Sequence, residues 1–132
     1  MARKPLMSRG ELEVARVLWR LKEATPRQVF EAYPNKRKVD FTTVQTFLRR
    51  LETKGHVVVR REGRKPHYRP RVRPNTVIRD FVDDFTKWLF DGEPMLLIRH
   101  MIEERDISEE ELRELREMLS RLEAEQDEGS QQ

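Results

Sequence analysis

The sequence predicts a mostly α-helical chain with one small β-hairpin, and three observations support this fold class. Before residue 56, apolar residues recur at helical spacing in three segments. Residues 56–72 are rich in valine and arginine and are interrupted by Gly63, so they predict a hairpin. After Pro74, three further apolar stripes return at helical spacing. Three helices followed by a basic hairpin is the order of a winged helix-turn-helix domain, which we expect over residues 1–74.

Capping signals predict where the first two helices begin. Ser8 and Glu11 have the spacing of a capping box, and they predict a helix that ends near residue 21. Thr25, Pro26 and Gln28 combine a cap, a proline at the first helical position and a capping-box partner. They predict a short second helix that ends near residue 33. A basic loop over residues 36–38 separates it from the third helix.

The third predicted helix has two different faces. Asp40 or Thr42 caps it and Gly55 ends it. Its inward row is apolar and consists of Val44, Phe47, Leu48 and Leu51. The opposite face carries hydrogen-bonding and basic side chains, namely Thr42, Thr43, Gln45, Thr46, Arg49 and Arg50.

That polar face has the chemistry of a surface that reads DNA. Major-groove recognition uses side chains that bond to base edges, with Arg suited to guanine, Gln to adenine and Thr to several bases. The residues predicted to contact bases are Thr42, Thr43, Gln45, Thr46 and Arg49, and Arg50 is predicted to contact a phosphate. The alternative is a solvated helix face, although threonine is a poor helix former.

The hairpin is expected to have strands over residues 56–62 and 67–72, with a turn at residues 63–65. Arg61, Arg64 and Lys65 are predicted to contact phosphates, which supplies affinity and register rather than sequence choice. A basic hairpin can also simply protect a sheet edge. Thr25 and the first amides of its helix are a further predicted phosphate site, although capping alone explains Thr25 equally well.

Residues 75–132 are predicted to form a helical dimerisation region with a frayed acidic tail. The helices are expected up to Asp91-Gly92, from Pro94 to about residue 102, and after a capping box at Ser108 and Glu111. The first stripe is wider than one helix needs, so two copies would bury it and form an isologous dimer. The alternative is packing of the three helices against the winged domain. The predicted dimerisation residues are Val77, Ile78, Phe81, Val82, Phe85, Trp88, Leu89, Leu97, Met101, Leu115 and Leu119.

Charge is divided unequally along the chain. Residues 1–74 hold 20 of the 27 Lys and Arg residues and 7 of the 24 Asp and Glu residues, a net charge of +13. Residues 75–132 hold 7 and 17 of them, a net charge of −10. The basic half favours a polyanionic partner such as double-stranded DNA, which would repel the acidic half. Arginine-rich surfaces also occur in thermophilic proteins without a nucleic-acid role.

Other function classes find little support. The chain has no cysteine, and its three histidines lack metal-binding spacing. We see no nucleophile motif or phosphate-binding glycine loop, so we expect no catalytic residue, metal, cofactor or small-molecule substrate. Without a signal peptide or a long apolar run, the chain is expected to be cytoplasmic and free of the membrane.

Four stretches carry a family resemblance: ELEVARVLW at 11–19, TTVQTFLRRLETKG at 42–55, REGRKPHY at 61–68 and LFDGEP at 89–94. They resemble the penicillinase-repressor family, the BlaI/MecI-like regulators, which also includes copper-responsive repressors of the CopY type. The resemblance covers most of the chain. It implies a homodimeric winged-helix repressor whose C-terminal helices dimerise and whose operators have TACA/TGTA-like arms, with Thr43, Thr46 and Arg49 in the DNA-reading helix.

Two departures from the family pattern bear on induction. CopY-type members bind metal through cysteine pairs, and a chain without cysteine excludes thiolate copper sensing. The β-lactamase regulators are cut by a membrane sensor-protease at an Asn-containing site in the dimerisation region. Here the only asparagines are Asn35 and Asn75, which argues against that route.

The sequence therefore predicts a homodimeric repressor that binds a palindromic DNA operator. One rival is a winged-helix adaptor whose basic face binds an acidic protein. A second is an RNA-binding protein, which is disfavoured because neither RNP aromatics nor a KH-type GxxG is present.

Overall fold

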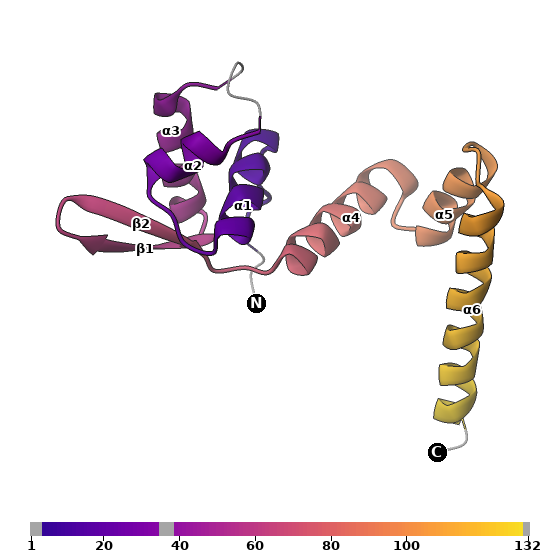
Figure 1. Cartoon of the computed structure of the whole chain (residues 1–132). Helices are drawn as coiled ribbons and strands as arrows, with labels where there is room; N and C mark the ends of the chain where they lie inside the picture. The colour runs from indigo at the N-terminus through magenta and orange to yellow at the C-terminus, as the bar shows by residue number, and fades with distance from the viewer. Residues whose placement is uncertain (1–3, 35–38, 131–132) are drawn as a thin grey trace. The chain divides into compact units, whose positions relative to one another are not determined.

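The computed structural model describes residues 4–34 and 39–130. These residues form two compact units, one before and one after the boundary between Asp84 and Phe85. The predicted basic loop at residues 36–38, and Asn35, lie outside the described residues. The elements are α1 (Arg9–Leu21), α2 (Pro26–Ala32), α3 (Phe41–Thr53), β1 (Val57–Glu62), β2 (Lys65–Pro70), α4 (Pro74–Phe90), α5 (Pro94–Glu103) and α6 (Glu109–Ser130) (Figure 1). The predicted fold class, a mostly helical chain with a winged helix-turn-helix domain, is confirmed.

Both predicted capping boxes form at the starts of α1 and α2. The side chain of Ser8 accepts from the backbone N–H of Glu11 at 3.2 Å, and the Glu11 carboxylate accepts from Ser8 N at 3.2 Å. Thr25 and Gln28 make the same reciprocal pair at 3.2 and 2.9 Å. At α3, Asp40 rather than Thr42 is the cap. These local bonds satisfy backbone donors that have no partner inside a helix.

The hairpin differs from its predicted bounds. β1 pairs antiparallel with β2, and Glu62 lies opposite Lys65, so the turn contains only Gly63 and Arg64. Gly63 has φ +64°, a left-handed conformation that lets a two-residue turn close. Lys65 therefore belongs to β2 and not to the turn, and β2 ends at residue 70 instead of 72.

A single bridge extends this sheet beyond the hairpin. Ala24, between α1 and α2, exchanges two backbone hydrogen bonds with Tyr68 of β2, at 2.9 and 2.8 Å. Tyr68 is buried, and its ring packs with the helices of the winged domain. We call the hairpin, residues 57–70, the wing. Both of its strands are attached to the helical part of the domain: β1 follows and contacts α3, and β2 pairs with Ala24.

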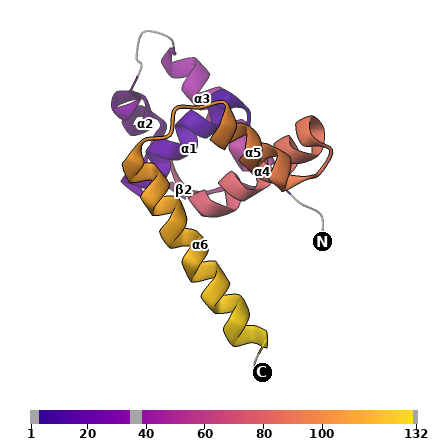
Figure 2. The same cartoon turned by 90° about the vertical axis from the view of Figure 1, so that its right-hand side faces the viewer.

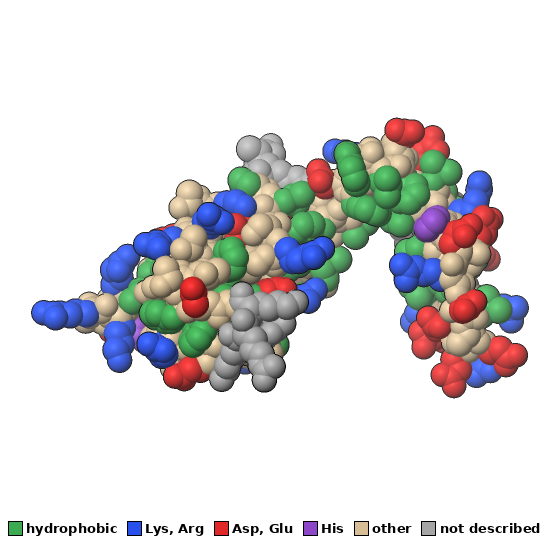
Figure 3. Space-filling view, turned by 90° about the horizontal axis from the view of Figure 1, so that it is seen from above, with side chains coloured by type: hydrophobic (Ala, Val, Ile, Leu, Met, Phe, Trp, Pro, Cys, Tyr) green, Lys and Arg blue, Asp and Glu red, His purple; other side chains and the backbone are tan. Residues whose placement is uncertain are grey.

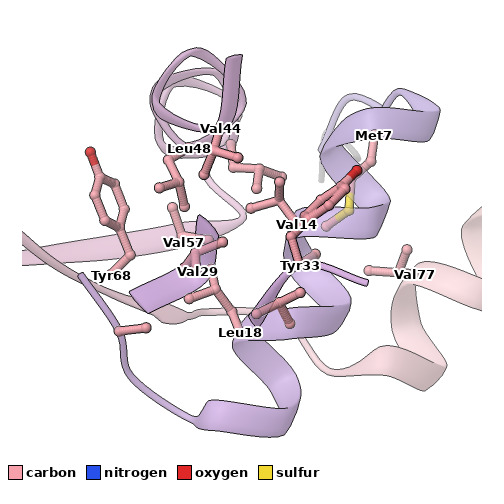
Figure 4. Packing of buried hydrophobic residues seen from close by; sticks show 14 residues of the cluster. Met7, Val14, Leu18, Val29, Tyr33, Val44, Leu48, Val57, Tyr68 and Val77 are labelled. Carbon is pink, nitrogen blue, oxygen red and sulfur yellow. The ribbon is translucent and has the colours of Figure 1, made fainter. Parts of the chain in front are cut away.

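The core of the first unit lies where the three helices and the sheet meet (Figure 4). The residues that share it are Met7, Val14, Ala15, Val17, Leu18, Ala24, Val29, Tyr33, Val44, Leu48, Leu51, Val57, Tyr68 and Val77. Phe47 is partly buried against this core and covers Gly10 of α1, where a Cβ atom on Gly10 would lie only 2.3 Å from the ring. Only glycine fits that approach without moving the ring.

The first turns of α4 belong to this core, which corrects one predicted role. Val77 is only 5% exposed and packs with the winged-helix core of its own chain, so its side chain is not free for a second protomer. Phe81 is partly buried against the same core. The two compact units divide inside α4, between Asp84 and Phe85.

A polar cluster joins the N-terminal segment to the end of α3. Lys54 Nζ donates to Glu11 Oε1 at 2.6 Å and to Leu6 O at 3.0 Å, and His56 Nε2 donates to Pro5 O at 2.6 Å. Burial raises the pKa of the Glu11 carboxyl, but hydrogen bonds from Lys54 and Ser8 outweigh burial and lower the pKa overall. Glu11 therefore stays ionised although its side chain is buried.

The second unit contains the end of α4 with α5 and α6. The Phe90 ring packs edge-on against Phe85 at 5.9 Å between centroids. Ser108 and Glu111 form the predicted capping box at α6. α6 is one continuous helix (Figure 2), and it extends to Ser130, whose hydroxyl donates to Gln126 O. The tail predicted to fray, EQDEGSQQ at residues 125–132, is helical as far as Ser130, although it contains Gly129.

Candidate nucleic-acid interface

Burial of one face of α3 orients the other. The side chains of Val44, Leu48 and Leu51 are fully buried, so the helix has a fixed rotation about its axis. Asp40 fixes its start, because Asp40 Oδ1 accepts from Thr43 N at 2.7 Å. This backbone hydrogen bond lowers the pKa of the Asp40 carboxyl and keeps the cap ionised.

The residues predicted to read bases all lie on the outward side of α3. Thr42, Arg49 and Arg50 are exposed, and Thr43, Gln45 and Thr46 are partly exposed. The Thr46 hydroxyl donates to Thr42 O at 3.0 Å. That bond uses the hydroxyl hydrogen, so both lone pairs of the oxygen can accept from a base amino group, and the methyl group can pack on thymine.

A groove of about 490 Å³ is lined by the start of α2, by α3 and by the wing. Its lining residues come from all three elements and are Thr25, Pro26, Arg27, Gln28, Phe41, Gln45, Arg64, Lys65, Pro66 and His67. The groove brings together four predicted site residues, Thr25, Gln45, Arg64 and Lys65. The other predicted phosphate contacts, Arg50 and Arg61, are exposed and lie outside it.

The basic side chains of the wing differ in their pairing. Arg60 forms ion pairs with Glu23 at 3.1 Å and Glu62 at 2.9 Å, so acidic neighbours already balance its charge. Arg64 and Lys65 have no ion pair within the described part of the chain. Basic side chains gather at the hairpin end of the first unit (Figure 3), where unpaired cations can attract an anion.

A family model described as penicillinase repressor matches residues 7–121. The chain belongs to the penicillinase repressor family. The penicillinase repressor of Bacillus licheniformis is 28% identical over 119 residues, which cover 90% of this chain and 93% of that protein. MecI, the methicillin resistance regulatory protein of Staphylococcus aureus strain N315, is 24% identical over 115 residues, covering 87% and 94%. The solution structure of the DNA-binding domain of the repressor BlaI has 31% identity and a TM-score of 0.49, and covers 56% of this chain and 90% of that domain.

The family resemblance predicted from four short motifs is thus confirmed, and those motifs can be placed in the fold of this penicillinase repressor family member. TTVQTFLRRLETKG covers α3 from its second residue and the start of the following turn, and REGRKPHY covers the end of β1, the turn and most of β2. Lys54, within TTVQTFLRRLETKG, is directed toward the N-terminal segment and not toward solvent, because its ammonium group donates hydrogen bonds to Glu11 Oε1 and Leu6 O.

Sequence reasoning missed Arg27 and Phe41 as residues of this surface. The Arg27 guanidinium carbon lies 4.4 Å from the centroid of the Phe41 ring. The sequence around both residues gives little indication of such a role. Arg27 comes soon after the helix cap at Thr25, Phe41 begins α3, and neither belongs to an apolar or basic run. Only the packing of α2 on α3 brings them together.

Metal and membrane sites find no support in the described residues. Residues 4–34 and 39–130 contain no group of three or more His, Cys, Asp or Glu side chains placed to hold a metal ion. In the same ranges, no helix is long and apolar enough to cross a membrane.

Proposed function

We propose that this chain is a sequence-specific DNA-binding transcriptional repressor that acts as a homodimer on a palindromic operator. The observation that carries the proposal is the outward polar face of α3, which lies between α2 and a basic wing. The opposite face of α3 is anchored in the core by the buried side chains of Val44, Leu48 and Leu51. Membership of the penicillinase repressor family supports the same conclusion. Bound to a promoter, such a protein represses by occupying the DNA.

In this proposal, α3 lies in the major groove of one half-site. Thr42, Thr43, Gln45, Thr46 and Arg49 contact base edges. Thr25, Arg50, Arg61, Arg64 and Lys65 contact the sugar-phosphate backbone on either side and set the register of α3. The acidic second unit, which carries most of the carboxylates, stays away from the DNA.

Exposed apolar residues of α4, α5 and α6 support the homodimer. Trp88 is 77% exposed, Leu119 is 56% exposed and Met101 is 51% exposed. Within the described residues, neither α5 nor α6 has a buried residue. Monomeric proteins rarely leave apolar patches this extensive in water, so a second copy is the simplest cover.

The proposed interface consists of predicted residues that are exposed or partly exposed in one chain. Its members among the predicted residues are Ile78, Phe81, Val82, Phe85, Trp88, Leu89, Leu97, Met101, Leu115 and Leu119. A groove of about 650 Å³ between α5 and α6, lined by Ile98, Ile102 and Met118 among others, is a place for side chains of the partner. Two DNA-reading helices related by a twofold axis then require a palindromic site.

The test compares a selected operator duplex with a scrambled one. Duplexes are enriched from a random pool, and binding of the full chain is measured by fluorescence anisotropy at about 0.15 M salt. Thr46→Ala should change the base preference, because it removes a base-edge group. Arg64→Ala should weaken both duplexes alike and reduce the slope of log K against log salt by about 1 per DNA-binding unit.

A surface arginine of the second unit supplies the control. Arg116→Ala, on the acidic helix α6, should leave binding to both duplexes unchanged. Equal affinity of the wild-type chain for operator and scrambled DNA would refute sequence-specific repression. Failure to bind either duplex would leave the protein-interaction adaptor as the better hypothesis.

A further inference from the structure

Arg27 occupies an unusual position at the edge of the groove between α2, α3 and the wing. Its guanidinium carbon lies over the Phe41 ring, 4.4 Å from the centroid, and 6.0 Å from the centroid of Phe30. Phe30 and Phe41 themselves pack edge to face, with centroids 6.0 Å apart. An aromatic pair from α2 and α3 thus supports one cation, through the attraction between a positive charge and the face of a ring.

The guanidinium of Arg27 has hydrogen-bond donors to offer a ligand. It carries five N–H donors, and their fork matches two oxygens of a phosphate. Within the described residues Arg27 has no ion pair with a carboxylate. Its donors are therefore held in place without a charged acceptor from that part of the protein.

The charge of the groove indicates what such an acceptor would be. Arg27 approaches from α2, and Arg64 and Lys65 approach from the wing, so three cations line one space. The lining residues include no Asp or Glu within the described chain. A space with cations on both sides and no carboxylate favours an anion that passes between them.

We propose that Arg27 is a DNA-backbone anchor positioned by Phe41, and that the strand flanking the half-site runs through this groove between α2 and the wing. The inference rests on the proposed DNA-binding function and adds a contact from α2 to it. Arg27 lies on α2 and not on the outward face of α3, so it meets phosphate and not base edges. Phe41 restricts the side chain before binding, so less conformational entropy is lost on contact.

A purely structural role for Arg27 and a role as phosphate anchor predict different effects of its removal. The salt dependence of DNA binding distinguishes the two roles. A side chain that only packs on two rings contributes to folding stability but releases no counterion when DNA binds. Removing a phosphate anchor lowers the affinity for every sequence alike. It also reduces the salt slope, which the loss of a packing role does not change.

The experiment measures operator and scrambled-duplex affinities over a salt series for the full chain and its variants. Arg27→Ala should reduce the slope of log K against log salt by about 1 per DNA-binding unit and weaken both duplexes by the same factor. Arg27→Lys should retain the wild-type slope with reduced affinity, because charge remains and the fork is lost. Arg16→Ala is the matched control, since Arg16 is an exposed arginine of α1 that does not line the groove, and it should leave the slope unchanged.

Phe41→Leu tests the positioning role. It should weaken binding by about two- to fivefold while Arg27 is present. In combination with Arg27→Ala it should have no further effect, because the ring then has no cation to hold. Thermal unfolding followed by circular dichroism identifies any variant that fails to fold, and the Arg27→Lys comparison still tests the anchor in that case.

The possible outcomes distinguish this inference from the proposed function. If the wild type prefers its operator and Arg27→Ala has the wild-type affinity and salt slope, the anchor is wrong and the repressor proposal stands. The anchor is equally wrong if Arg27→Ala changes base preference and leaves the slope intact. If the wild type binds no DNA, both proposals fail together.

Discussion

Replacing Lys54 with methionine should destabilise the winged domain through the buried carboxylate that Lys54 neutralises. Lys54 Nζ lies 2.6 Å from Glu11 Oε1, and the Glu11 side chain is only 2% exposed. Methionine keeps most of the aliphatic stem and its packing, so the change removes mainly the charge. Glu11 would then remain buried with only the bonds at Ser8, and Leu6 O would lose a donor.

The structure sets the size of the effect. Removing one partner of a fully buried ion pair costs about 3–5 kcal/mol. The Lys54 side chain is 27% exposed, so water reaches one end of the pair and we expect about 2–4 kcal/mol. That is a large part of the roughly 5–15 kcal/mol that stabilises a typical domain. The melting temperature should fall by about 10–25 °C.

Urea unfolding, followed by circular dichroism, measures this loss directly. A double-mutant cycle with Glu11→Gln isolates the pair, and its coupling free energy should be about 1–3 kcal/mol. The prediction is wrong if Lys54→Met unfolds within about 0.5 kcal/mol of the wild type. A large loss with zero coupling would instead assign the effect to the bond between Lys54 and Leu6 O.

The dependence on pH gives a second check with a defined sign. The pKa of Glu11 is lowered in the folded wild type, so its contribution is present above the ordinary carboxyl pKa of about 4.3 and is lost as the pH falls through the lower folded value. In Lys54→Met, burial acts with less opposition and raises the pKa. The difference in unfolding free energy between wild type and variant should therefore shrink on acidification. A difference that is constant from about pH 7 to about pH 3 would contradict this account.

Two further predictions concern helix packing and assembly. Gly10→Ala places a Cβ atom 2.3 Å from the Phe47 ring and should lower the free energy of unfolding by about 1–3 kcal/mol, measured by thermal unfolding. The control Gly129→Ala, which has open space around the new Cβ atom, should be neutral or slightly stabilising. Equal melting temperatures for the two variants would show that the Phe47 ring moves freely. Trp88→Glu should weaken the free energy of association of the proposed homodimer by about 2 kcal/mol or more, measured by sedimentation equilibrium. Lys87→Glu, at an exposed position of the same helix, is the control and should leave association unchanged. If Trp88→Glu dimerises like the wild type, Trp88 is not part of the interface.

Much of the fold follows from signals that lie within a few residues of one another. The caps at Ser8 and Thr25 predict helix starts that the structure confirms, because a cap is a bond between residues three apart. Spacing alone identifies the two faces of α3, since a helix with one apolar row must turn its polar row outward. The ends of the turn at Gly63 were harder to predict, because a two-residue and a three-residue turn use similar residues.

Contacts between distant residues were beyond these local signals. Val77 has the same apolar character as Ile78 beside it, but packing in the winged-helix core buries Val77 and leaves Ile78 exposed. Lys54 looks like one more basic residue of the DNA-binding half until the fold places it beside Glu11. Charge and periodicity describe a residue type and its spacing, and they do not say which distant residue it meets.

By itself, the sequence determined the order of helices and hairpin, the family, and the polar face of α3, since each depends on residue type at short spacing. The tertiary structure alone decided which cations are already paired, which apolar residues of α4 belong to the core, and that the Arg27 guanidinium lies over the Phe41 ring. The physical reason is that pairing, burial and stacking depend on distances between elements far apart in the chain, which only their packing defines.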